Sequence, residues 1–169
     1  MKATQLLKKQ HRSVHGLFGE LKKLDGAARR TMMDRISKEL AHHMAIEEGI
    51  FYPAVRQLDT KKTQEMVPEA LEEHHVLKLV LAELPRVDPQ DERFEAKMTV
   101  LAEIVEHHVA EEEKEMFKTA EKLGDERLRL LGDQMASGAP MDAGPRRARK
   151  RASAPLPRRG AESHSPRHA

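Results

Sequence analysis

The sequence contains no cysteine and no tryptophan, and its only aromatic residues are four phenylalanines and one tyrosine among 169 residues. Without cysteine, the chain can form no disulfide framework, thiolate zinc site, iron–sulfur cluster or nucleophilic thiol. No stretch approaches the ~18 apolar residues of a membrane span, and the N-terminus lacks the apolar segment of a secretory signal. We therefore expect a soluble, cytoplasmic protein that makes no membrane contact.

Charge and histidine divide the chain near residue 136. Residues 1–136 carry 22 Lys/Arg and 26 Asp/Glu, whereas residues 137–169 carry 8 basic and 2 acidic residues. Eight of the ten histidines lie in the first part. The second part is rich in Ala, Gly, Pro, Ser and Arg, and its only large apolar residues are Met141 and Leu156. It cannot bury enough surface to offset the entropy of ordering. We expect a folded body, residues 1–136, and a disordered basic tail, residues 137–169.

The composition of the body predicts an all-α fold. It is rich in Leu, Ala, Glu, Lys and Met, and its breaks lie near residues 24–29, 58–63 and 85–92. Thr60 is expected to precede the third helix, and Asp88-Pro89 to open the fourth. Four long segments with short connections favour an antiparallel up-down-up-down four-helix bundle, with a short fifth helix after Gly124.

The body contains an internal repeat. Residues 42–53, "HHMAIEEGIFYP", align with residues 107–118, "HHVAEEEKEMFK", at an offset of 65. The first and third segments align at an offset of 63, which places His11 on His74. Each half therefore carries one histidine on its first helix and His-x₃-Glu on its second. Such a duplicated pair predicts a pseudo-two-fold body with two metal half-sites at its centre.

Helical phase separates the paired residues of each motif. At 100° per residue, His43 and Glu47 fall within the apolar stripe of the second segment, whereas His42 and Glu48 point away. In the fourth segment, His108 and Glu112 likewise fall within the apolar stripe, whereas His107 and Glu113 point away. The residues that we expect to face inward are His11, His43, Glu47, His74, His108 and Glu112, with His11 at the edge of its stripe.

These six residues predict a metal site. A single histidine on an apolar stripe is usually a hydrogen-bonded core residue, but here four histidines and two glutamates converge from four helices. Burying two carboxylates there without compensation would be very costly, and a pair of divalent cations supplies that compensation. Mixed histidine and carboxylate ligation without thiolate suits iron or manganese, and suits zinc less well.

The succession His11, His43-x₃-Glu47, His74, His108-x₃-Glu112 resembles the hemerythrin-like (HHE cation-binding) domain over nearly all of residues 1–120. "EEGIFYP" after the histidine pair is also typical of that family. The resemblance implies two iron ions with an oxo or hydroxo bridge, Glu47 and Glu112 as bridging ligands, and the four histidines as terminal ligands. It also implies an open position for O₂.

Two departures from oxygen-carrying hemerythrins weigh against reversible O₂ storage. Those proteins have a second histidine one turn after the third-helix histidine, where this chain has Lys78, and they end in His-x₄-Asp, where this chain has His108-x₃-Glu112. In the first copy of the repeat, His15 follows His11 by one helical turn. The missing histidine would follow His74 by the same spacing. We hypothesise that His15 is a fifth histidine ligand; the alternative is a boundary residue bonded to solvent.

Three functions are compatible with this pattern. The leading one is a binding or sensor protein for O₂, related small oxidants such as NO or peroxide, or iron itself. A second is a di-iron enzyme that consumes peroxide or O₂, which we favour less because the site is rich in histidine. A third is a metal-stabilised bundle whose tail, with "RRARKR" at 146–151, weakly contacts nucleic acid, an anionic surface or a partner. The oligomeric state stays open.

Overall fold

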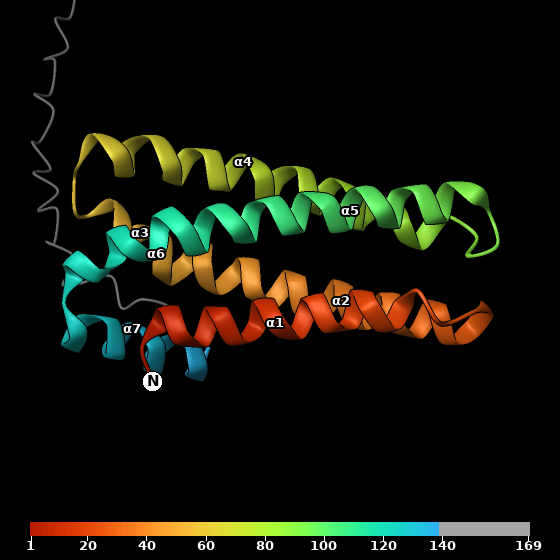
Figure 1. Cartoon of the computed structure of the whole chain (residues 1–169), viewed down its shortest axis with the longest axis horizontal. Coiled ribbons are helices and arrows are strands. Elements are labelled where there is room, and N and C mark those ends of the chain that lie inside the picture. Colours follow the sequence, from red (N-terminus) through yellow and green to blue (C-terminus); the bar gives the residue numbers. More distant parts are fainter. Residues whose placement is uncertain (139–169) are drawn as a thin grey trace, which may run out of the picture.

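The computed structural model describes residues 1–138, and it is all-helical over that range (Figure 1). The prediction of an all-α chain is therefore confirmed for this part of the sequence. The expectations about the basic tail fall almost entirely on residues 139–169, outside the described residues. Among residues 1–138, none of the helices combines the length and the apolar character that crossing a bilayer requires.

The four expected long segments and the short fifth helix are present. They are α1 (Ala3–Leu21); α2 (Gly26–Ile46), continued by η1 (Glu47–Phe51) and α3 (Tyr52–Arg56); α4 (Lys61–Glu83), ending in η2 (Leu84–Arg86); α5 (Glu92–Glu111), continued by η3 (Glu112–Met116), α6 (Phe117–Ala120) and η4 (Glu121–Leu123); and α7 (Asp125–Ser137). The segments η1 and η3 are single turns of π-helix, and η2 and η4 are 3₁₀ turns.

Local capping explains where the third and fourth segments begin. Thr60 precedes α4, and its hydroxyl accepts a hydrogen bond from the backbone N–H of Thr63, as predicted. The prediction that Asp88-Pro89 opens the fourth segment is wrong. Asp91 caps α5 instead, by accepting a bond from the backbone N–H of Arg93, and Asp88 belongs to the preceding turn.

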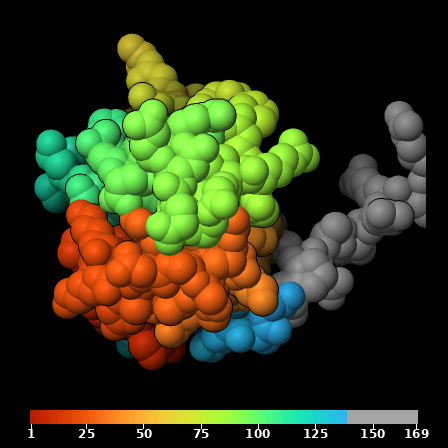
Figure 2. Space-filling model, turned by 90° about the vertical axis from the view of Figure 1, so that its right-hand side faces the viewer, coloured from red at the N-terminus to blue at the C-terminus, as the bar shows by residue number. Residues whose placement is uncertain are grey.

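The long helices lie side by side along the longest axis of the molecule (Figure 1). The α1–α2 connection and the α4–α5 connection are at the same end, so the two copies of the repeat form two helix pairs stacked on each other. Figure 2 looks at that end and shows the α1–α2 turn in orange beside the α4–α5 turn in green. The α3–α4 connection is at the opposite end of the molecule.

Two apolar clusters fill the interior, one on each side of a polar layer. One contains Val14, Leu40, Leu77 and Leu101 and lies toward the α1–α2 and α4–α5 turns. The other lies toward α7, which packs against α1 and η1. α7 approaches the N-terminus of α1 so closely that a Cβ at Gly132 would clash with the backbone oxygen of Met1. The histidines and glutamates predicted from the sequence form the polar layer between the clusters.

Candidate metal centre

Six buried residues from four helical rods meet in the polar layer. They are His11 from α1, His43 from α2, Glu47 at the start of η1, His74 from α4, His108 from α5 and Glu112 at the start of η3. Ligand atoms of His11, His43, Glu47 and Glu112 lie within 4.8 Å of one another, and so do those of Glu47, His74 and His108. The structure thus brings together all six residues that helical phase placed inward, in two adjoining groups that share Glu47.

Both glutamates sit at the start of a π turn. The backbone N–H of Tyr52 bonds to the carbonyl of Glu47, and that of Phe117 bonds to the carbonyl of Glu112, each five residues along the chain. Isolated π turns inside α-helices are frequent at functional sites. Here they occur at matching positions of the repeat, and each widens its rod beside the polar layer. The constant 100° rotation assumed for the sequence therefore holds up to Glu47 and Glu112 and fails after them.

The histidines face one another in pairs through their Nε2 atoms. The Nε2 atoms of His11 and His43 are 3.1 Å apart, as are those of His74 and His108. Nε2 of His43 also lies 3.1 Å from a carboxylate oxygen of Glu47. In a neutral imidazole that carries its proton on Nδ1, Nε2 presents a lone pair. Two lone pairs at this distance repel each other unless a cation lies between them.

The four Nδ1 atoms each have an acceptor, which supports that tautomer. His11 Nδ1 lies 2.9 Å from Glu113, and His43 Nδ1 lies 2.8 Å from the side-chain oxygen of Gln10. The corresponding distances in the second pair are 2.9 Å from His74 to Glu48 and 2.7 Å from His108 to Glu73. Outward hydrogen bonds of this kind fix the ring orientation of metal-binding histidines and raise their basicity. The sequence assigned Glu48 and Glu113 only to outward positions, and their role depends on contacts between rods.

The two central glutamates are buried and lack hydrogen bonds. Glu47 is 0% exposed and Glu112 is 2% exposed, and none of their four oxygens has a hydrogen-bond partner among residues 1–138. Burial, and then the charge of Glu112, raises the pKa of Glu47 well above its ordinary value. An uncompensated buried carboxylate costs several kcal/mol. This arrangement fits a site built to hold cations.

Burial also favours the neutral form of His43 and His74. It lowers the pKa of His74 to about 4, with the neighbouring His108 acting in the same direction and Glu48 opposing it. Burial, followed by the charges of His11, His108 and His74, lowers the pKa of His43 well below its ordinary value. Neutral imidazole is the form that binds metals, so these rings are ready to bind cations near neutral pH.

Tyr52 is a site residue that helical phase did not single out, and Phe117 stands at its position in the other copy of the repeat. Its hydroxyl lies 3.2 Å from Nε2 of His74 and 3.5 Å from Nε2 of His108. Burial, and then the charges of Glu47 and Glu112, raises its pKa far above the ordinary value. Phe117 instead stacks on the ring of His11, with centroids 5.8 Å apart. The two half-sites therefore differ by a hydroxyl group.

His15 lies outside the group. Its side chain is 76% exposed, and its Nε2 lies 3.9 Å from Glu106. The geometry gives the fifth-histidine hypothesis no support and agrees with the alternative of a boundary residue, because α1 carries His15 one turn beyond the polar layer. At the equivalent repeat position, Lys78 contacts Glu48 at 2.6 Å. That contact and the bond from His74 outweigh burial and lower the pKa of Glu48.

Curated relatives share the body of the chain. A protein named DNA nickase from Nostoc sp. (strain PCC 7120) is 29% identical over 119 residues, which is 69% of this chain but 33% of that protein. The chain thus spans about a third of that relative. Uncharacterized protein Rv2633c from Mycobacterium tuberculosis (strain H37Rv) is 29% identical over 142 residues, covering 81% of this chain and 84% of that one.

A solved structure agrees with the fold. The crystal structure of a hemerythrin HHE cation binding domain-containing protein from Mycobacterium kansasii, described as a homolog of Rv2633c, matches with a TM-score of 0.72. Identity is 25%, and the match covers 82% of this chain and 85% of that one. The family model for the hemerythrin HHE cation binding domain matches residues 2–120, which include the six residues of the polar layer. The chain belongs to the hemerythrin HHE cation binding domain family.

Proposed function

We propose that the chain binds two iron ions through the six residues of the polar layer and uses them to bind or sense O₂ or a related small oxidant such as NO or peroxide. His11 and His43 would hold one ion, His74 and His108 the other, and Glu47 and Glu112 would serve both. The metal assignment rests on one observation. Four buried carboxylate oxygens that lack hydrogen-bond partners lie beside the Nε2 atoms of four histidines. The four long rods would form an antiparallel bundle, a fold that builds such sites from facing helices.

The donor set favours iron or manganese over zinc, and we propose iron. Imidazole and carboxylate together suit iron and manganese, and two ions that share carboxylates use more ligands than a tetrahedral zinc site requires. Two iron ions held here would supply electrons for the reversible reduction of a small oxidant. The chain would supply neutral histidines, two negative charges and outward hydrogen bonds that hold the rings in place.

The space beside the histidines supports a small ligand. A cavity of about 10 Å³ is lined by all four histidines and by apolar residues that include Val14, Leu40, Leu77 and Val105. That volume is close to the minimum that can hold one water molecule. A diatomic molecule or a peroxide matches this size far better than an organic substrate does.

Tyr52 does not line this cavity, but its hydroxyl is placed to donate a hydrogen bond to a ligand bound beside His74 and His108. Its raised pKa keeps the hydroxyl protonated, and the hydroxyl points between the Nε2 atoms of His74 and His108. The half-site of His11 and His43 has Phe117 at the equivalent position and offers no such donor. We therefore assign the small oxidant to the half-site of His74 and His108.

Metal counting and an oxygen-dependent spectrum test this proposal. Protein purified from iron-supplied cells and kept anaerobic should contain two iron ions per chain. Exposure to air should then produce a charge-transfer band. Zero or one tightly bound ion would contradict the proposal. Steady-state consumption of added peroxide would instead favour the enzymatic alternative.

A further inference from the structure

The repeat gives the polar layer two equivalent flanks. Within residues 1–138, the flank between α4 and α5 is open, whereas α7 covers the flank between α1 and α2. Between α4 and the rod formed by α5 and η3 lies a cavity of about 210 Å³. Its lining includes six glutamates and one lysine, namely Glu65, Glu69, Glu73, Glu111, Glu112, Glu115 and Lys62. Lys62 is engaged in an ion pair with Glu115. The cavity therefore has a strong excess of negative charge.

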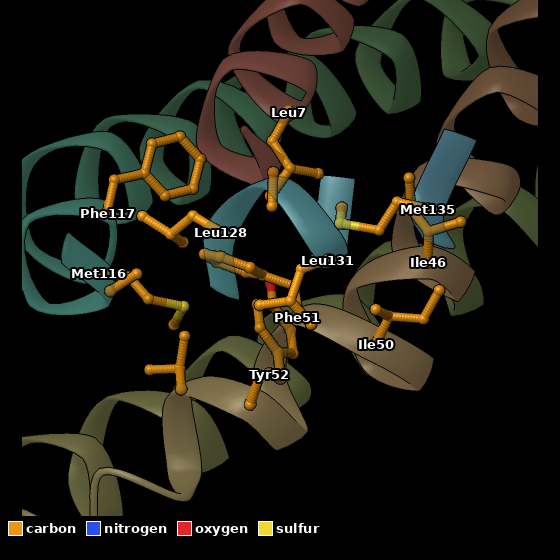
Figure 3. Packing of buried hydrophobic residues seen from close by; sticks show 14 of the residues in the cluster. Leu7, Ile46, Ile50, Phe51, Tyr52, Met116, Phe117, Leu128, Leu131 and Met135 are labelled. Atoms are coloured by element: carbon orange, nitrogen blue, oxygen red, sulfur yellow. The ribbon is translucent and has the colours of Figure 1, made fainter. Parts of the chain in front are cut away.

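The equivalent flank in the other half has no carboxylate at the matching positions and is covered by α7. At the repeat offsets, the positions of Glu65, Glu69, Glu73, Glu111 and Glu115 are taken by Lys2, Leu6, Gln10, Ile46 and Ile50. Figure 3 shows Met135 of α7 beside Ile46, and Leu128 and Leu131 of α7 belong to the same apolar cluster. Carboxylates thus line the flank that α7 leaves open and are absent from the flank that it seals.

The open cavity extends from the surface to the metal centre. Glu69 and Glu111 are exposed at its outer side, whereas His108 and Glu112 form its inner wall. The carboxylate oxygens of Glu112 are buried and have no hydrogen-bond partner in the part of the chain that the structure describes. A cation that enters the cavity would therefore find an unpaired carboxylate at its inner end.

A second group of metal-ligand type lies beside this cavity. Glu73, His107 and Glu111 offer ligand atoms within 4.8 Å of one another. Nε2 of His107 is 3.6 Å from Glu73 and 3.7 Å from Glu111, and His107 is 65% exposed. The other oxygen of Glu73 lies 2.7 Å from Nδ1 of His108. Glu73 therefore connects the surface group to the buried histidine.

We propose that this acidic cavity is the route by which divalent cations reach the metal centre, and that Glu73, His107 and Glu111 hold a cation at its outer side. Imidazole with two carboxylates is a weak site for Fe²⁺ or Mn²⁺, and a cleft of one charge concentrates ions of the opposite sign. The route rests on the proposed metal-binding function, whereas the surface site can be tested without it.

The surface site is tested with Mn²⁺ as the probe. In the full chain carrying Glu47→Ala and Glu112→Ala, Mn²⁺ titrated under electron paramagnetic resonance should bind at one weak site per chain. Adding His107→Ala and Glu111→Gln should abolish that binding, whereas adding His42→Ala, at the exposed counterpart of His107, should not. If the double variant does not fold by circular dichroism, the wild-type chain preloaded with tightly bound metal serves instead. Weak binding that survives His107→Ala with Glu111→Gln would overturn the surface site.

The route is tested by anaerobic stopped-flow uptake of Fe²⁺ into the metal-free chain. The variant with Glu69→Gln, His107→Ala and Glu111→Gln should take up Fe²⁺ about tenfold more slowly while reaching the same final iron content. The variant with His42→Ala should match the wild type. Equal uptake rates in all three proteins would overturn the route. A wild type that takes up no Fe²⁺ would contradict the proposed function and the route, while the Mn²⁺ titration would still decide the surface site.

Discussion

Glu48 accepts a hydrogen bond from His74, with 2.9 Å between its Oε1 and the Nδ1 atom of the histidine. The two residues belong to different copies of the repeat, because Glu48 follows Glu47 on η1 and His74 lies on α4. Glu113 makes the reciprocal contact, at 2.9 Å, with His11. Glu48 and Glu113 each follow a central glutamate, and each therefore orients a histidine of the other copy of the repeat. These two hydrogen bonds link the two halves around the polar layer.

Replacing Glu48 should weaken metal binding at one half-site. Glu48→Ala removes the acceptor that orients His74, so we expect affinity for one of the two ions to fall about 10- to 100-fold. Glu48→Gln should recover part of the loss, because Gln10 already supports His43 through an amide oxygen. Competition with a chelator measures both affinities, and Glu113→Ala is the matched change at the other half. Equally tight binding of both ions by Glu48→Ala would contradict this role.

The adjacent histidines of the second segment should behave oppositely. His43→Ala removes a buried imidazole that points at Glu47, so the chain should lose at least one metal ion per molecule. His42 is exposed, so His42→Ala should keep both ions. Metal content after purification under identical iron supply compares the two variants. The reverse result would refute the assignment by helical phase.

Tyr52→Phe should leave the fold and the metal content intact, because the repeat already accommodates a phenylalanine at position 117. The loss of one hydrogen bond of about 1.4 kcal/mol should speed release of bound NO about tenfold. Stopped-flow dissociation measures this rate in the reduced iron protein. Phe117→Leu, which changes the other half-site without removing a hydroxyl, is the control. An unchanged rate in Tyr52→Phe would exclude it as the donor.

Metal binding should stabilise the chain strongly. Cations relieve the burial cost of Glu47 and Glu112, so free metal at about 1,000 times its Kd should add about 4 kcal/mol to the free energy of unfolding. For a chain of this size, the melting temperature should rise on the order of 10 °C. Differential scanning calorimetry with and without metal measures the shift. The variant with Glu47→Gln and Glu112→Gln should show almost none, and an equal shift in that variant would place the stabilising metal elsewhere.

His15→Ala should change neither metal content nor spectrum. The side chain is mostly exposed, and its nearest acidic neighbour is Glu106 at 3.9 Å rather than a residue of the polar layer. The electronic spectrum of the iron-loaded variant, recorded beside the wild type, is the decisive measurement. A shifted charge-transfer band would revive the hypothesis that His15 is a ligand.

Helical phase placed the six central residues correctly because each rod is regular α-helix up to the polar layer. The regular α-helices that contain His43 and His108 end at Ile46 and Glu111, and the π turns begin at the next residue. Within that range a constant rotation per residue is a sound assumption. The exposure of His42 and His107 follows from the same rule.

The remaining site residues depend on information that no single helix contains. Tyr52 lies after the π turn, so its direction depends on a wider turn that the apolar pattern does not encode. Glu48 and Glu113 point out of their own stripes, and their partners lie on other rods. Their role follows only from how the rods are aligned along one another.

If two ions bind as proposed, the placement of α7 would make them chemically distinguishable. The family match ends at residue 120, so α7 lies beyond it, and α7 covers only the half that holds His11 and His43. A duplicated helix pair alone would give both ions the same surroundings. With one side sealed, the ion at His74 and His108 would exchange with solution faster than its neighbour. Brief treatment with a chelator followed by a second metal would then yield a mixed-metal protein with a defined order of occupancy.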